Sequence, residues 1–159
     1  SRHGQSRHYF HTEVGVNGRI DTLQAAILLA KLELFDGEVA FRQQIGERYS
    51  QCFQTAGVAT TPYLAPGNTS VYAQYTIAVE NRAAVQEALK DIGIPTAVHY
   101  PTLLCQQPAL QGCGSRCSGA CATPLAQGAS ERVMSLPMHP YLSAQDQDQV
   151  VAAVTAALH

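Results

Sequence analysis

Two polar side chains, Asn17 and Arg19, stand directly before a predicted helix and form the first candidate site. Asp21 can cap that helix, and Gln24, three residues later, can reach back to it in a capping box. The first turn of a helix carries free N–H groups and the positive end of the helix dipole, so it attracts anions such as phosphate. The spacing therefore predicts a phosphate ligand shared by Asn17 and Arg19. The alternative is an ordinary Gly–Asn turn with a solvated arginine.

His99 and Tyr100 form the second candidate site, because they stand at the end of a predicted strand, immediately before Pro101. Ligand-binding groups gather at such strand ends and in the loops that follow them. Imidazole and phenol groups can both donate hydrogen bonds to phosphate or carboxylate oxygens. The pair therefore predicts contact with an anionic ligand, and the alternative is a packed aromatic pair before a turn.

The other histidines point less clearly to chemistry. His139 lies between Pro137 and Pro140, which fix the backbone in an extended turn, so a structural role is favoured. No nucleophile elbow is present, which argues against a Ser-His-Asp hydrolase. The first residues of the chain are locally basic, and either bind a ligand or form an unanchored end. The charged or titratable side chains of that stretch are Arg2, His3, Arg7, His8 and His11.

Three of the five cysteines, Cys113, Cys117 and Cys121, recur at every fourth residue of a Gly- and Ser-rich stretch. A zinc site usually pairs one CxxC-type motif with a second pair of ligands, and the sequence offers no second pair. We therefore predict that these cysteines are free thiols in a loop and bind no metal. The alternative is a fortuitous metal or disulfide. An odd cysteine count without a secretory signal predicts reduced thiols and a cytoplasmic location.

The composition predicts a globular domain with a covered surface. The chain has 159 residues, of which 46% are hydrophobic and only 14% are charged. So few charges, with many Ala and Leu residues, indicate that part of the domain's surface is buried against another protein surface. The net charge of −2 without a basic cluster argues against nucleic-acid binding. No apolar run approaches the roughly 18 residues of a transmembrane helix.

Apolar periodicity predicts the elements. Residues 21–35 read as a helix that is apolar on all sides, and such a helix is buried or lies at an interface. Asp36-Gly37 interrupts the pattern, and a second helix over 38–56 has an apolar face of Phe41, Ile45, Tyr49, Cys52 and Phe53. The two together could make one long, bent helix. Downstream we predict strands over 71–79, 95–100 and 133–136, and helices that begin near Asn81, Pro124 and Ser143.

Single residues are expected to set the faces and ends of these elements. Alternation over 71–79 puts Val71, Tyr75, Ile77 and Val79 on one face and Tyr72 on the other. Asn81 and Ser143 are expected to cap their helices, and Gly57 and Gly93 to end the helices before them. The inner face of the helix after Asn81 is expected to hold Val85, Leu89 and Ile92.

These residues resemble a known family, the sugar aminotransferases related to DegT, DnrJ, EryC1 and StrS, which use pyridoxal phosphate (PLP). The resemblance covers nearly the whole chain, in the family's order. It is carried by the Gly15–Ala26 run, Lys31-Leu32, Arg42, Tyr49, Ser70–Thr76, Pro95–Pro101 and Ser135–Leu142.

The resemblance implies a fold class and a domain organisation. The fold is expected to be α+β: the C-terminal small domain of a fold-type I PLP-dependent aminotransferase. It would hold a short sheet with helices on one face, preceded by a long interdomain helix. Residues 1–20 would be a remnant of the large-domain active-site segment, 21–56 the linking helix and 57–159 the small domain.

The resemblance also implies a function. The family's matching asparagine, here Asn17, binds the cofactor phosphate across a homodimer with shared active sites. Arg19, His99 and Tyr100 would bind the substrate, a UDP-linked keto sugar, with glutamate as amino donor. The family would place the reaction in the biosynthesis of lipopolysaccharide O-antigen or a similar cell-surface polysaccharide.

The chain carries only two lysines, Lys31 and Lys90, and both lie in helical runs. Transamination needs a lysine that holds PLP as a Schiff base and moves a proton between carbons. Neither lysine has the surroundings of the family's catalytic lysine, so we predict no catalytic residue in this chain. The chain is then expected to be the C-terminal part of a longer enzyme and inactive alone. The alternative is a non-catalytic assembly or scaffolding domain that kept the fold.

Overall fold

The computed structural model describes residues 4–7, 10–16, 18, 20–57, 60–108 and 123–159. The chain divides into two compact units, Ser1–Glu38 and Val39–His159, and helix α1 (Thr22–Ala56) contributes residues to both. The first unit also holds a short antiparallel pair, β1 (Gln5–Arg7) with β2 (Phe10–His11).

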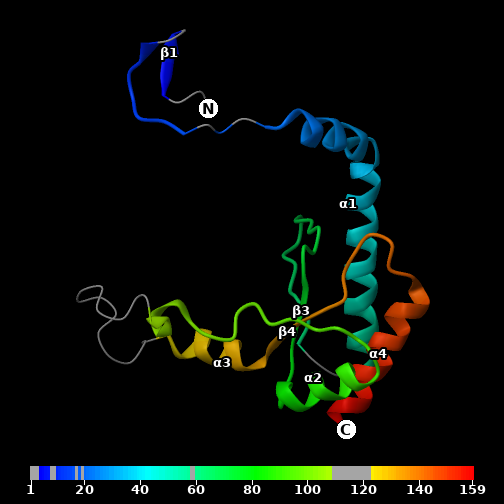
Figure 1. Ribbon diagram of the computed structural model, residues 1–159. Coiled ribbons are helices and arrows are strands. Elements are labelled where there is room, and N and C mark those ends of the chain that lie inside the picture. Colours follow the sequence, from blue (N-terminus) through cyan, green and yellow to red (C-terminus); the bar gives the residue numbers. More distant parts are fainter. Residues whose placement is uncertain (1–3, 8–9, 17, 19, 58–59, 109–122) are drawn as a thin grey trace. The chain divides into compact units, whose positions relative to one another are not determined.

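The second unit is an α+β domain, as the sequence predicted. Its core is built by the C-terminal part of α1, a two-stranded sheet and helices that cover one face of that sheet. Figure 1 shows α4 beside the C-terminal half of α1. After α1 the elements are β3 (Tyr75–Ala78), α2 (Arg82–Asp91), the 3-10 turn η1 (Leu104–Gln106), α3 (Pro124–Arg132), β4 (Val133–Leu136) and α4 (Ala144–Leu158).

Strand register places one face of the sheet in the core. β3 and β4 pair antiparallel, with Tyr75 opposite Leu136 and Ile77 opposite Met134. Directly opposed residues share a face, and these four side chains are all buried. They pack with side chains from the three covering helices. The core members on those helices are Ile45, Tyr49, Phe53, Val85, Leu89, Val150 and Val154.

The strand predicted over 95–100 is not formed as a strand. Only Ala97 pairs with β4, through two hydrogen bonds with the backbone of Ser135 at 3.1 and 2.7 Å. Pro95 has no N–H with which to extend the ladder. At the opposite edge, Thr60 makes a similar single bridge to Ala78. The strand predicted over 133–136 is confirmed.

The strand predicted over 71–79 begins later than its alternating pattern indicates. Tyr75, Ile77 and Val79 are buried as predicted, but Val71 is exposed and Tyr72, expected on the opposite face, is buried. The backbone of Tyr72 is left-handed, with φ of 41°, which breaks the extended conformation. The ordered strand therefore starts only at Tyr75.

Helix ends follow the predicted chemistry in all but one case. Gly57 and Gly93, with positive φ, lie just past α1 and α2 as predicted. Gly93 N–H donates to Lys90 and Ile94 N–H to Leu89, the paired bonds of a Schellman motif. The predicted Asn81 side-chain cap is wrong. Asn81 adopts a left-handed turn (φ 50°) and its side chain makes no cap hydrogen bond, because a side-chain cap typically needs an extended backbone at the capping residue.

Helix α1 is continuous through Asp36-Gly37, so the stretches predicted as helices over 21–35 and 38–56 form one long helix, as the sequence allowed. In its second half Ile45, Tyr49 and Phe53 are buried as predicted, whereas Phe41 is about half exposed. The predicted inner face of α2 is correct for Val85 and Leu89. It is wrong for Ile92, which is exposed just past the helix end.

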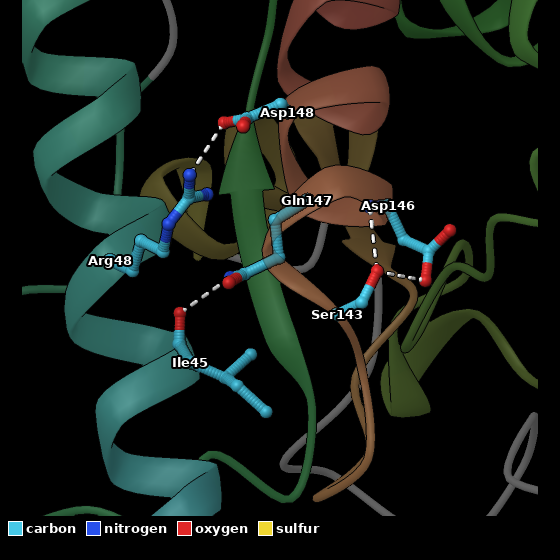
Figure 2. Close-up of polar contacts among 6 residues, drawn as sticks. All are labelled: Ile45, Arg48, Ser143, Asp146, Gln147 and Asp148. Carbon is cyan, nitrogen blue, oxygen red and sulfur yellow. Dashed lines mark hydrogen bonds and ion pairs between the residues drawn. The ribbon is translucent and has the colours of Figure 1, made fainter.

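Two polar contacts join α1 to α4 (Figure 2). The buried amide of Gln147 donates to the carbonyl oxygen of Ile45 at 2.8 Å. One turn further along α1, the guanidinium of Arg48 donates to Asp148 at 2.7 Å. The first contact satisfies a buried polar group, which is costly to leave unpaired. The second is a partly exposed ion pair, which contributes little on its own.

The predicted cap of α4 at Ser143 is confirmed and gives a first testable prediction. Ser143 Oγ accepts a hydrogen bond from the backbone N–H of Asp146 at 3.1 Å and donates to its carboxylate at 2.6 Å (Figure 2). Ser143→Ala is expected to lower the free energy of unfolding by about 1 kcal/mol, measured by urea denaturation. Ser143→Thr keeps the hydroxyl and is the control. Equal loss in both variants would contradict a capping role.

The described helices include none that is long and apolar enough to cross a membrane. Within the same residues, no group of three or more His, Cys, Asp or Glu side chains is arranged to hold a metal ion. Cys52 is a free thiol. Cys105 forms a disulfide bond, so the expectation of reduced thiols is wrong for this residue, since an odd cysteine count still allows a pair. Cys113, Cys117 and Cys121 lie outside the described residues.

Candidate functional site

The start of α1 is capped as the sequence predicted. Asp21 Oδ1 accepts a hydrogen bond from the N–H of Leu23 at 2.8 Å. Gln24 makes no return bond to Asp21 in the described structure, so the capping box is incomplete. Because the Asp21 carboxylate occupies one N–H of the first turn, as the sequence argument already allowed, at most the other first-turn N–H groups remain for an anion. The predicted site residues Asn17 and Arg19 lie outside the described residues, so their roles stay predictions.

His99 and Tyr100 are described, and both are exposed. Their rings meet edge to face, with centroids 5.5 Å apart and planes at 81°. The pair is therefore in contact, as the structural alternative expected, yet it is not buried. Within the described part of the chain no side-chain hydrogen bond occupies either residue. An imidazole and a phenol are left available to a ligand at this point of the surface.

The sheet edge positions His99 and Tyr100. Ala97, two residues before His99, exchanges two backbone hydrogen bonds with Ser135 of β4. Thr76 and Ser135 also share a hydroxyl hydrogen bond at 2.9 Å, which ties β4 to β3. On the other side, Gln86 of α2 donates to Thr96 at 2.9 Å. The chain that leads to the candidate pair is thus anchored to the sheet and to a helix.

Arg42 fixes another segment, in a way that sequence spacing could not reveal. Its guanidinium donates to the backbone carbonyls of Val71, Tyr72 and Ala73 at 2.9, 2.9 and 3.0 Å. Five donors in a planar fork let one arginine satisfy several carbonyls of an irregular segment. Arg42 and the 70–76 stretch each carried the family resemblance, and the structure shows that they contact one another.

Buried hydroxyl groups attach β3, and the residue that follows β4, to α1. Tyr75 and Ser50 share a hydrogen bond of 2.8 Å, and Tyr49 donates to the carbonyl of Pro137 at 3.2 Å. Burial raises the pKa of Tyr75 to about 12 and that of Tyr49 further still. Both phenols therefore stay protonated at neutral pH, so these contacts are structural and do not supply an acid or base.

The remaining sequence candidates have mainly structural surroundings. His139 Nδ1 accepts a hydrogen bond from the N–H of Tyr141 at 3.3 Å, and its carbonyl accepts one from Leu142. This agrees with the structural role predicted for the Pro-flanked turn. In the N-terminal stretch, the Arg7 guanidinium lies 4.6 Å from the centre of the Phe10 ring. Arg2, His3 and His8 lie outside the described residues.

Several relatives of this chain are named as aminotransferases. The chain is 48% identical over 98% of its length to the UDP-2-acetamido-2-deoxy-3-oxo-D-glucuronate aminotransferase of Pseudomonas aeruginosa, and covers 41% of that protein. Its structure matches a DegT DnrJ EryC1 StrS aminotransferase from Brucella abortus with a TM-score of 0.87 and 34% identity, over 99% of this chain and 41% of that one. It also matches ntda from Bacillus subtilis with bound cofactor PMP, with a TM-score of 0.82 and 25% identity, over 99% and 37%.

The chain spans about two fifths of the length of the curated relatives it matches. Over that span the match is nearly complete, because the model of the DegT/DnrJ/EryC1/StrS aminotransferase family aligns with residues 1–155. Together with the α+β fold, this shows that the chain belongs to the DegT/DnrJ/EryC1/StrS aminotransferase family.

Proposed function

We propose that this chain is part of a PLP-dependent aminotransferase that acts on a nucleotide-linked keto sugar. The proposed substrate is UDP-2-acetamido-2-deoxy-3-oxo-glucuronate, with glutamate as the amino donor. The identity of 48% to the Pseudomonas aeruginosa enzyme over 98% of the chain carries this proposal. A cytoplasmic location and a role in lipopolysaccharide O-antigen biosynthesis, or that of a similar polysaccharide, belong to the same proposal and rest on the same relative.

The two lysines of the chain do not fit the task of holding PLP. Lys31 is exposed on α1. Lys90 is exposed near the end of α2, 3.5 Å from the carboxylate of Glu87. A Schiff-base lysine needs a site that desolvates it and surrounds it with acid–base partners, and neither residue has one. PLP supplies the electron sink for amino transfer, so we propose that a lysine elsewhere in a longer polypeptide holds it.

This chain would then supply groups that bind the reactants. Asn17 is proposed to bind the cofactor phosphate across a homodimer with shared active sites. Arg19, His99 and Tyr100 are proposed to bind the anionic sugar nucleotide. The exposure of His99 and Tyr100 on an anchored segment supports a binding role, because their polar atoms need no rearrangement to meet a ligand.

The lysine argument gives the second testable prediction. After incubation of the 159-residue chain with PLP, borohydride reduction and digestion, mass spectrometry is expected to find no stoichiometric label on Lys31 or Lys90. The full-length polypeptide of the encoding gene, treated identically, is expected to carry one label on a lysine outside this chain. Stoichiometric labelling of Lys31 or Lys90 would show that the cofactor is held here. No label in either sample would favour a non-catalytic domain that kept the fold.

A further inference from the structure

The disulfide-bonded Cys105 lies on the segment that follows the candidate pair His99 and Tyr100. It is half-buried in the 3-10 turn η1. Cys52 is a free thiol, so it is not the partner. The remaining cysteines of the chain are Cys113, Cys117 and Cys121. By elimination the partner of Cys105 within this chain is one of these three, which lie outside the described residues.

The hydrogen bonds of η1 fix the shape of this turn but not its place on the domain. Leu103 N–H donates to Gln106 Oε1 at 3.1 Å, and Gln106 N–H donates to the Leu103 carbonyl at 3.0 Å. Gln107 N–H donates to the Leu104 carbonyl at 3.1 Å. Each of these contacts joins residues of the turn itself, so all of them would persist if the turn moved as a whole. The disulfide of Cys105 is a constraint that comes from outside the turn.

This disulfide shortens the connection in which His99 and Tyr100 lie. Upstream of them, Ala97 is hydrogen-bonded to β4. Downstream, α3 begins at Pro124 and runs directly into β4. Both ends of the connection are therefore attached to one strand, and a cross-link inside a long connection removes conformational freedom from it. The oxidised chain is thus expected to restrict the positions that His99 and Tyr100 can take.

The spacing of the other cysteines favours a disulfide that can be exchanged. They recur at every fourth residue, so whichever of them is bonded to Cys105 has two others close to it in sequence. A thiolate opens a disulfide through a mixed-disulfide intermediate, and a neighbouring thiol makes that attack intramolecular. The proposed cytoplasmic location adds a pool of small thiols that keeps most protein cysteines reduced.

We propose that Cys105 and its partner are a reversible redox pair, and that the oxidised pair favours binding of the sugar nucleotide by His99 and Tyr100. This inference rests on the proposed function and adds a regulation of the same site. Reduction consumes two molecules of a monothiol such as glutathione: the S–S bond breaks, each cysteine takes up one proton and one electron, and the two monothiols become one disulfide. Oxidation by glutathione disulfide is the reverse reaction.

Binding of UDP-glucuronate to the full-length polypeptide of the encoding gene tests the inference, because this nucleotide sugar lacks the 3-oxo group that would accept the amino group. Calorimetric titrations are run in oxidised and in reduced glutathione buffer. Reduction is expected to raise the dissociation constant about two- to tenfold for each side chain that must then be ordered on binding. Cys105→Ser should bind as the reduced polypeptide does in both buffers. Cys52→Ser, which removes a free thiol, is the matched control and should still respond to the buffer.

Peptide mapping gives a second readout that needs no ligand. Free thiols of the oxidised polypeptide are alkylated before digestion, and the Cys105 peptide is expected to be linked to a peptide from residues 109–122 until it is reduced. Cys105→Ala is expected to bind as Cys105→Ser does, so the result does not depend on how serine is tolerated. An unpaired Cys105, equal dissociation constants in both buffers, no binding in either buffer, or a Cys105→Ser variant that still responds would each overturn the inference.

The proposed function is tested separately in the same buffers. If UDP-glucuronate binds with an affinity that depends on the redox state, but glutamate gives no amino transfer to the proposed keto sugar, the redox pair stands and the proposed activity fails. If amino transfer is found and neither binding nor transfer responds to glutathione, the redox pair is wrong and the proposed activity stands.

Discussion

Replacing Gly46 with alanine is expected to destabilise the protein by about 1–3 kcal/mol. A Cβ atom at position 46 would lie 2.3 Å from Cδ2 and 2.7 Å from Cγ of the Tyr72 ring, far inside van der Waals contact. The ring cannot easily move away, because Tyr72 is buried and its carbonyl is bonded to Arg42. The substitution must therefore displace either the helix or the irregular segment around Tyr72. Urea denaturation measures the loss.

Gly37 in the same helix provides the matched control. No atom lies within 4 Å of a Cβ placed there, so Gly37→Ala adds helix propensity without a clash. It is expected to stabilise the helix by about 0.5–1 kcal/mol. The two identical substitutions should thus change the free energy of unfolding in opposite directions. Equal effects of both would mean that the contact between Gly46 and Tyr72 does not constrain the fold.

The Gly46 contact also shows why strand β3 could not be delimited from the sequence. Alternation over 71–79 was a sound local signal, and it holds from Tyr75 onward. Before Tyr75 the backbone is set by residues about 30 positions earlier, because Arg42 binds three carbonyls there and Gly46 receives the Tyr72 ring. No periodicity encodes contacts between distant segments, so tertiary structure overrides the local pattern.

Helix ends that depend on local chemistry were predicted correctly, except at Asn81. Glycine tolerates the left-handed conformation that ends a helix, which explains the success at Gly57 and Gly93. Ser143 caps α4 because its side chain reaches an N–H three residues later. Asn81 has the same local chemistry available, but asparagine also tolerates the left-handed turn, and that turn is formed instead. Composition alone cannot choose between these two uses of asparagine.

The candidate site was predicted in part from residue types and in part from resemblance. His99 and Tyr100 are exposed just after the single bridge from Ala97 to β4, but the strand whose end the argument invoked is not formed, so their binding role stays a prediction. The Asp21 cap that formed part of the helix-start argument is confirmed, whereas Asn17 and Arg19 lie outside the described residues. Contacts from these two side chains to an anion therefore stay proposals.

Arg19→Ala and His99→Ala in the full-length polypeptide are expected to lower kcat/KM for the sugar nucleotide by about ten- to a hundredfold each. A hydrogen bond to a charged group contributes roughly 1.5–3 kcal/mol, which corresponds to that range. The half-reaction with glutamate should change much less, because both residues are proposed to bind the sugar nucleotide and not the amino donor. Stopped-flow absorbance of the cofactor separates the two half-reactions.

A conservative variant distinguishes binding from folding at position 99. His99→Gln keeps a side-chain donor and is expected to recover part of the lost kcat/KM, whereas a role in packing against Tyr100 would not be restored by an amide. The packing role would also lower the thermal midpoint of His99→Ala. If either alanine variant slowed both half-reactions equally, that residue would act on the cofactor or on the fold, and its assignment as a contact to the sugar would be wrong. His99 is exposed, and Ala97, two residues earlier, is hydrogen-bonded to β4. We therefore expect His99→Ala to slow only the half-reaction with the sugar nucleotide.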